Sequence, residues 1–326
     1  MIVLVVSVLA AVLPTALYVC AVWWLDRYEK EPMQLLGAAF LWGAVPGVLL
    51  SVAVELVAGV PTSLLDATLA NVLNTSFTAP VVEELVKACA LLTLFLVYHR
   101  EFDGVLDGIV YGAVVGFGFG MTENVLYFLS AYDSGGLASW GQVVFLRTAV
   151  FGLNHALYTA TVGAGLGLIR YRRDVGQRVL IPLAALVLAI TLHGVHNLFA
   201  QVGSVVCWGI LVSLASDWAG VLVLVAVAVL AGRHERQWIT LELADEVKRG
   251  TLTVAEYRLL QSSRSRLVAR LGALTDGGWR AYRHLGTFFH LATELAFRRY
   301  QAHAGDANVD AAEIESLRRQ IGSLRS

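Results

Sequence analysis

The sequence predicts an all-α fold, in which a polytopic membrane helix bundle of about seven spans is followed by a small helical cytoplasmic tail. Of the 326 residues, 57% are hydrophobic and only 15% are charged, whereas about 25% of the residues of a soluble domain are charged. Seven segments are apolar over the roughly 20 residues that a helix needs to cross a bilayer. We therefore divide the chain into a transmembrane domain, residues 1–231, and a cytoplasmic helical C-terminal region, residues 232–326.

Short connections separate the predicted spans. The first span ends at Trp23-Trp24, an aromatic pair typical of a membrane interface, and without a signal-peptide cleavage site we expect it to be retained. Pro80 lies near the start of the third span, where its missing N–H costs little. The fourth and fifth spans are rich in glycine, which favours close helix packing. The seven ranges are 2–25, 33–59, 77–98, 108–131, 143–169, 179–200 and 205–231.

The C-terminal region has helical signals and a basic charge. It holds 15 Lys/Arg against 11 Asp/Glu. Thr253 and Glu256 form a capping box that opens a helix, and Gly277-Gly278 breaks the chain before another helical stretch at 279–303. A last amphipathic helix is predicted by apolar residues that step by three and four, namely Ile314, Leu317, Ile321 and Leu324.

Basic residues alternate between the predicted loops. Residues 60–76, 132–142 and 201–204 contain no Lys or Arg. The other loops contain Arg27 and Lys30, then Arg100, then Arg170, Arg172, Arg173 and Arg178. Because cytoplasmic loops carry an excess of Lys and Arg, we expect a multi-pass protein of the cell membrane with its N-terminus outside and its C-terminal tail in the cytoplasm.

Four polar clusters interrupt the apolar segments. A charged group near mid-bilayer costs about 3 kcal/mol or more, so each cluster is a candidate functional site. Counted from the span ends, the clusters converge on one layer in the outer half of the bilayer. They contain Glu83, Glu84 and Lys87, then Glu123 and Asn124, then Asn154 and His155, and finally His193, His196 and Asn197.

The spacing within the clusters suggests how the side chains meet. Glu83 and Lys87 lie four residues apart on one helix face, where they could form an ion pair that only fixes helix contacts. The second carboxylate, Glu84, leaves an excess of negative charge and a group able to act as a general base. His193 and Asn197 share a face, while His196 is one residue off it. Glu123 and Asn124 either join the site or hold its other residues in place.

Hydrolysis of a peptide bond inside a membrane needs a water, a base, a proton donor and stabilisation of the oxyanion. The sequence lacks a Gly-x-Ser-x-Gly nucleophile motif and the His-Glu-x-x-His signature of zinc proteases. A metal site built from Glu and His of different spans is chemically feasible. However, Asn197 is a poor zinc ligand and Lys87 would repel a dication, so we favour water activation by glutamate without a cofactor, with zinc as the alternative.

These residues resemble the PrsW family of intramembrane proteases over residues 15–200. The resemblance lies in Asp26 to Pro32, in Glu83-Glu84-Leu85-Val86-Lys87, and in the glycine-rich segment from Asp107-Gly108 to Glu123-Asn124. Phe151-x-x-x-His155 and His193-x-x-x-Asn197 resemble the second and third motifs of the wider superfamily, which includes CAAX prenyl endopeptidases and bacteriocin-processing proteins. That superfamily has Arg later in its first motif, where this chain has Lys87 at the PrsW spacing.

The resemblance implies an endopeptidase that cuts membrane-spanning substrates, such as anti-sigma factors, on the extracytoplasmic side. It implies that Glu83 activates water with His155 as partner, that His193 and Asn197 stabilise the oxyanion, and that Glu84 orients the base. Lys87, Glu123 and Asn124 would support the site.

Two other functions compete with the protease. Buried Glu, Lys and His also build proton relays in ion-coupled transporters, although the inverted repeat that would favour transport is not seen. A catalytically silent membrane scaffold on the same fold is the third. As partners we expect a membrane-spanning protein substrate and the lipid bilayer, and no nucleic acid. Anionic lipid could contact Arg264, Arg266 and Arg270 of the tail, but we favour a solvated face for these three arginines.

Overall fold

The computed structural model describes residues 1–25, 30–59, 65–203, 206, 208–304 and 310–324. These residues form helices and connections, with no β-strand among them. The chain separates into two compact units, of which the first ends at Ala228 and the second contains Val229–Ser326. The Asp26–Glu29 part of the first predicted loop, with Arg27, lies outside the described residues. Glu31 at the end of that loop is buried and accepts a hydrogen bond from the Tyr111 hydroxyl.

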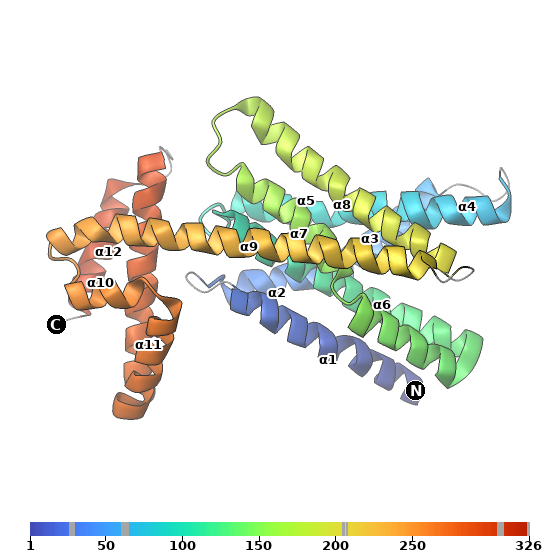
Figure 1. Ribbon diagram of the computed structural model, residues 1–326, viewed down its shortest axis with the longest axis horizontal. Helices are drawn as coiled ribbons and strands as arrows, with labels where there is room; N and C mark the ends of the chain where they lie inside the picture. The colour runs from blue at the N-terminus through green and yellow to red at the C-terminus, as the bar shows by residue number, and fades with distance from the viewer. Residues whose placement is uncertain (26–29, 60–64, 204–205, 207, 305–309, 325–326) are drawn as a thin grey trace. The chain divides into compact units, whose positions relative to one another are not determined.

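The first unit is built from nine helices and three π-helical turns in the described residues (Figure 1). In chain order they are α1 (Ile2–Leu25), α2 (Met33–Trp42), η1 (Gly43–Gly47), α3 (Val48–Ala58), α4 (Ala67–Leu73), η2 (Asn74–Thr78), α5 (Ala79–Val97), α6 (Val105–Phe145), η3 (Leu146–Val150), α7 (Asn154–Leu168), α8 (Val175–Gly203) and α9 (Trp208–Lys248), whose last part belongs to the second unit.

Five helical stretches in the described residues are long and apolar enough to cross a membrane, by length and composition alone. They are Ile2–Leu25, Met33–Ala58, Val105–Leu168, Val175–Gly203 and Trp208–Lys248. The stretch Val105–Leu168 contains the fourth predicted span and all but the last residue of the fifth. Helix α5 covers the third predicted span, but it carries three charged residues and is not among the five. The predicted all-α membrane fold is therefore confirmed, and the number of spans stays a prediction.

Helix α6 reverses direction near its end, so that α7 lies beside it (Figure 1). The reversal is at Gly136, whose φ of 65° lies in the left-handed region that favours glycine. The chain returns through η3 and then leaves helical geometry at Phe151, whose φ is −114° and ψ is 14°. Helix α7 begins at Asn154. This break places Asn154 and His155 in the first turn of α7, where they line a cavity.

Glycines bring α6 and α7 unusually close. A Cβ atom added to Gly108 would lie 2.1 Å from the carbonyl oxygen of Gly163, and one added to Gly116 would lie 2.2 Å from that of His155. Such distances require backbone-to-backbone contact, which only glycine allows. The glycine-rich fourth and fifth predicted spans thus pack as expected. The contact at Gly116 also fixes the position of His155 along the axis of α6.

The second unit contains the end of α9, α10 (Val254–Leu260), α11 (Ser263–Ala304) and α12 (Ala311–Ser323). The predicted capping box of Thr253 and Glu256 is confirmed at the start of α10. Leu317 and Ile321 of α12 are buried in an apolar core with residues of α9, α10 and α11. Beside this core, burial alone would raise the pKa of Glu246, but hydrogen bonds from Arg318, Thr251 and Arg299 hold that pKa below its usual value.

One expectation for the tail is wrong. Arg266, which we expected on a solvated face with Arg264 and Arg270, is only 6% exposed. Its guanidinium donates to the carbonyl oxygen of Leu260 at 2.8 Å and to the hydroxyl of Thr293 at 2.9 Å. A helix period alone does not reveal this, because the chain folds back at Gly278 and covers that side of the helix.

We predict that Gly108→Ala destabilises the transmembrane unit, because its new methyl group would overlap the backbone of α7. Overpacking of this kind typically costs about 1–3 kcal/mol. Gly141→Ala is the matched control, since a Cβ at Gly141 would have no neighbour within 4 Å. Thermal unfolding of both variants in detergent, followed by size-exclusion chromatography, checks the difference. Equal melting temperatures for the two variants would contradict the close packing of α6 on α7.

Candidate active site

Helix α5 carries three charged side chains that face the interior of the bundle. It follows the π-helical turn η2 directly and has Pro80 at its start, where a proline is tolerated. Glu84 and Lys87 are fully buried, and Glu83 is 6% exposed. Because unpaired charges are not stable in such surroundings, the helices packed on α5 must supply partners.

The Lys87 ammonium lies at the centre of these groups. Its Nζ donates to Glu84 Oε1 at 2.8 Å and to Glu83 Oε2 at 3.1 Å, and it lies 3.2 Å from Nδ1 of His155. The ammonium also lies over the ring of Phe119, 3.9 Å from its centroid, in a cation–π contact. An ammonium has three donors, and the two carboxylates and the imidazole account for all of them.

The two glutamates are bound to different degrees. Glu84 accepts from Lys87, lies 3.0 Å from Nδ1 of His193, and accepts from the Thr159 hydroxyl at 3.3 Å. Among the described residues, the hydrogen bond that Glu83 accepts comes from Lys87, and Nδ1 of His155 is 4.0 Å from its carboxylate. Glu84 is therefore held by three groups, while Glu83 keeps more capacity to accept a further proton.

His155 lies between a cation and a carboxylate. Its Nδ1 faces Lys87 at 3.2 Å, and its Nε2 lies 2.8 Å from Glu123 Oε2. Since an ammonium can only donate, these partners assign the lone pair to Nδ1 and the N–H to Nε2. Glu123 thus fixes the orientation of the ring, as a carboxylate behind a catalytic histidine does.

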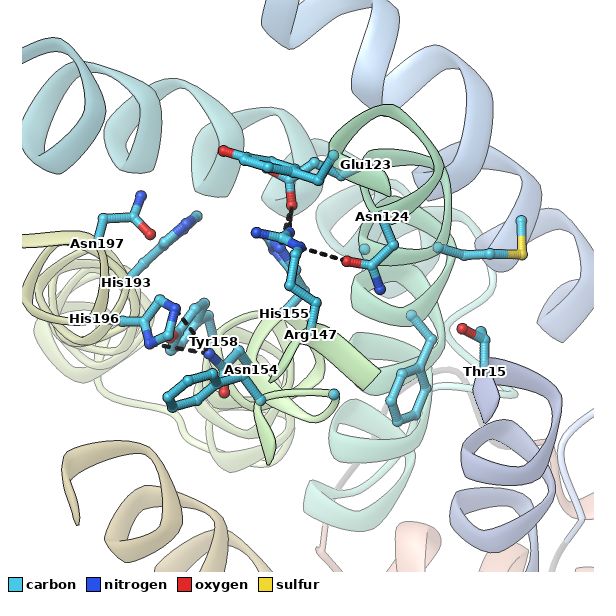
Figure 2. A pocket seen from close by; sticks show the side chains of 16 residues that line it. Thr15, Glu123, Asn124, Arg147, Asn154, His155, Tyr158, His193, His196 and Asn197 are labelled. Carbon is cyan, nitrogen blue, oxygen red and sulfur yellow. Dashed lines mark hydrogen bonds and ion pairs between the residues drawn. The ribbon is translucent and has the colours of Figure 1, made fainter. Parts of the chain in front are cut away.

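Arg147 is a site residue that the sequence reasoning missed. It comes from η3, and its guanidinium donates to Glu123 Oε2 at 2.5 Å and to Asn124 Oδ1 at 2.6 Å (Figure 2). Arg147 therefore joins Asn124 to Glu123, which contacts His155 directly. The signal was present, because Arg147 is a charged residue within the predicted span 143–169.

A second polar network surrounds His196. Its Nδ1 lies 2.7 Å from Asp217 Oδ2 and 2.7 Å from the Ser213 hydroxyl, while the Tyr158 hydroxyl donates to the other carboxylate oxygen at 3.1 Å. Both Ser213 and Asp217 contact the same ring nitrogen, so they do not form a Ser-His-Asp triad, in which the serine and the aspartate contact different nitrogens. Asp217 was also missed, although it lies within the predicted span 205–231.

Tyr158 joins this network to His193. Its ring stacks on the His193 imidazole, with centroids 4.8 Å apart and an interplanar angle of 17°. His193 itself is 3% exposed and reaches Glu84 through Nδ1. The Tyr158 hydroxyl, bound to Asp217, therefore limits how the ring that supports His193 can move.

The predicted residues of α8 do not behave alike. Asn197 uses its amide to donate to the backbone oxygen of Thr75 in η2 at 2.8 Å. His196 is one residue off the face that His193 and Asn197 share, yet it borders the same cavity as they do and lies 3.1 Å from the Asn154 amide. Three polar residues of the sixth predicted span thus border one cavity (Figure 2), namely His193, His196 and Asn197.

A cavity of about 60 Å³ lies at this point. One water needs about 10–15 Å³ measured in this way, so the cavity has room for several. Polar residues of α6, η3, α7 and α8 contribute to its wall (Figure 2): Glu123, Asn124, Arg147, Asn154, His155, Tyr158, His193, His196 and Asn197. Glu83 and Glu84 are outside this lining and reach it only through His155 and His193.

The same cluster offers ligand types that suit a metal. Glu83, Glu84, His155 and His193 each present one ligand atom, and these atoms lie within 4.8 Å of one another. These four groups could therefore hold a metal ion. However, Lys87 Nζ bonds or contacts three of them. As arranged, the ammonium takes the centre of the cluster, and a metal ion would bind there only after Lys87 had moved.

Comparison with known proteins gives a consistent result. The model of the family described as PrsW family intramembrane metalloprotease matches residues 31–233, which is more than half of the chain. This match contains the three charged residues of α5 and the histidines of α7 and α8. No solved structure shows a significant match to the chain.

Curated relatives point the same way. Protease PrsW of Geobacillus kaustophilus is 32% identical over 174 residues, which cover 53% of this chain and 69% of the relative. Protease PrsW of Oceanobacillus iheyensis is 27% identical over 195 residues, 59% of this chain and 81% of the relative. Protease PrsW of Bacillus subtilis is 28% identical over 177 residues, 53% and 72% respectively.

We predict that Lys87→Met strongly destabilises the transmembrane unit. Removing one partner of a buried ion pair typically costs about 3–5 kcal/mol, because the other charges stay buried without compensation. Lys248→Met is the matched control, since its side chain is 80% exposed and its ion pair with Asp245 lies at the surface. Denaturation of both variants in mixed micelles measures the difference. If Lys87→Met unfolds like the control, the ammonium does not hold the cluster together.

Proposed function

This chain belongs to the PrsW family of intramembrane metalloproteases, and we propose that it cuts membrane-anchored protein substrates at the polar cavity between α6, η3, α7 and α8. Family membership confirms that the protein is a membrane-embedded protease, and the transporter and the silent scaffold lose their support. One observation carries the proposed mechanism. Two buried carboxylates of α5 share a single ammonium, and one of them, Glu83, is held less completely than the other.

We assign the role of general base to Glu83. A water that enters from the cavity past His155 and binds beside the Glu83 carboxylate would transfer a proton to it as the water oxygen attacks the carbonyl carbon of the scissile bond. The carbonyl π electrons move to the oxygen, and when the tetrahedral intermediate collapses the C–N bond breaks and the leaving nitrogen receives the proton. Glu84, with three partners, positions Lys87 and His193 and is less available for proton transfer.

The remaining residues receive roles according to where they lie. His155 is fixed by Glu123 and Lys87 and borders the cavity, so we propose that it positions the water and relays the proton. His193 and Asn197 border the same cavity, and we assign them to the oxyanion. Arg147 holds Glu123 and Asn124 in place as a positioning residue.

The family name implies a metal, and the geometry supports a different catalytic group. A metal would need the place that Lys87 Nζ holds among Glu83, Glu84 and His155. We therefore propose that glutamate activates the water directly and derive no step through a metal ion. Should zinc bind after Lys87 turns away, the two glutamates and two histidines are the residues that would hold it, and it would supply the polarised water.

The family and the loop charges support a proposal for the substrate and for its side of the membrane. We propose a membrane-spanning protein, with an anti-sigma factor as the class that the family resemblance implies. The N-terminus would lie outside, the tail in the cytoplasm, and the cavity nearer the extracytoplasmic surface.

We predict that Glu83→Gln abolishes cleavage of a single-span substrate by purified protein, while the variant still folds. The amide keeps the shape of the side chain but cannot accept the proton, and loss of a general base typically lowers the rate by a factor of about 10²–10⁴. Glu315→Gln, an exposed change in α12, is the control. Wild-type activity in Glu83→Gln would make Glu83 structural and move the base to Glu84 or Glu123.

Cysteine labelling in intact cells tests the proposed orientation, in which the N-terminus lies outside and the tail in the cytoplasm. A membrane-impermeant thiol reagent added outside should modify a cysteine at Asp133, close to the Gly136 reversal, and should spare one at Arg172, beyond the other end of α7. Both positions are exposed, so neither result can be ascribed to burial. The opposite pattern would place the N-terminus and the proposed site on the cytoplasmic side.

A further inference from the structure

Helix α11 of the tail is a helical hairpin (Figure 1). It reverses at Gly278, whose φ is 69°, and its two arms pack together. Arg270 of the first arm lies over the Tyr282 ring of the second, 4.1 Å from its centroid. Nearer the core, Arg266 donates to Thr293 of the second arm. The tip of the hairpin therefore has defined geometry.

The hairpin tip exposes an apolar strip. On the first arm, Leu267, Leu271 and Leu274 follow one another at helical spacing and are 54%, 48% and 37% exposed, and Val268 beside them is 62% exposed. Trp279 at the start of the second arm is 64% exposed. By contrast, the base of the hairpin is closed into the apolar core through Phe288 and Phe289. Several large apolar side chains exposed on one hairpin indicate an interaction surface.

The charges around this strip are mostly positive. Residues 263–293 contain five arginines, which are Arg264, Arg266, Arg270, Arg280 and Arg283, and one acidic residue, Asp276. Arg266 is buried, while Arg264, Arg280 and Arg283 are exposed. The acidic residues of the tail gather elsewhere, for example at Glu242 and Glu246, where they bind Arg299. The hairpin tip is thus both apolar and cationic.

We propose that the tip of the α11 hairpin docks onto the anionic phospholipid surface of the membrane in which the protein is embedded. Exposed leucines, a tryptophan and arginines on one element are the composition of segments that lie in a bilayer interface. Each arginine near an anionic leaflet contributes about 1 kcal/mol, and tryptophan favours the interfacial region. The tail follows the last predicted span within one helix, α9, so tethering makes even weak surface binding effective.

An anionic membrane fits this surface better than a second copy of the chain. Two copies meeting through this face would bring six exposed arginines together with little acidic charge, and like charges across an interface are costly. The proposal goes beyond peptide hydrolysis and does not depend on it, because the hairpin contains none of the residues assigned to the reaction.

The test uses the full chain in nanodiscs, with its three cysteines replaced by alanine. A polarity-sensitive fluorophore is attached at Val268→Cys on the hairpin, and at Val254→Cys in α10 as the matched control, since that valine is 53% exposed. In discs rich in phosphatidylglycerol, we expect the Val268 probe to shift to the blue and to be quenched several-fold more by spin-labelled lipid than the control probe. In purely zwitterionic discs, the difference should disappear.

Charge reversal separates lipid docking from other causes. Arg280→Glu with Arg283→Glu should abolish the shift of the Val268 probe, whereas Arg249→Glu with Arg319→Glu, an equal change of charge elsewhere on the tail, should keep it. Circular dichroism must show the same helicity for both double variants. No shift in anionic discs, an equal shift in zwitterionic discs, or a shift that requires two chains in one disc would each overturn the proposal. Measured proteolysis is not needed, so a failed Glu83 experiment leaves this test intact.

Discussion

The ammonium of Lys87 lies in the interior of a helix bundle that the bilayer surrounds, and its charge constrains every group nearby. In a medium of low polarity, an uncompensated cation or carboxylate is much less stable than in water. Two glutamates and an imidazole therefore gather around Lys87 within hydrogen-bonding distance. The two negative charges exceed the single positive one, and this excess leaves Glu83 with capacity for a proton. The same requirement for compensation that stabilises the cluster also gives it a base.

The backbone makes this gathering possible. His155 reaches Lys87 because the helical path is interrupted between η3 and α7, and because Gly116 lets α6 approach the His155 carbonyl. Glu123 contacts His155 and in turn binds Arg147. Asp217 likewise contacts both His196 and Tyr158. Each step joins a different helix to the next through a polar contact. These contacts position the side chains of the cavity wall relative to one another, which preorganised catalysis requires.

Much of this site was visible in the sequence, because charge within apolar segments is rare and costly. Glu83, Glu84, Lys87 and the histidines stand out in the sequence for this reason, and their helical spacing places Glu83 beside Lys87. Arg147 and Asp217 are charged residues within predicted spans and stand out in the same way. Sequence position does not reveal that Asn197 binds the backbone at Thr75 or that His196 turns toward the cavity, because side-chain rotation easily makes up a one-residue offset on a helix. Nor could periodicity show the reversal at Gly278 that buries Arg266, since burial there depends on the second arm of the hairpin.

The proposed glutamate mechanism requires Lys87 at the centre of the cluster. The metal-dependent mechanism that the family name implies requires a metal ion there instead. The most direct measurement is a crystal structure of the protein supplemented with zinc, with anomalous diffraction recorded on both sides of the zinc absorption edge. We expect density for Lys87 Nζ within hydrogen-bonding distance of Glu83, Glu84 and His155, and no anomalous peak among these side chains. An anomalous peak bound by the glutamates and histidines, with Lys87 turned away, would contradict direct activation of water by glutamate.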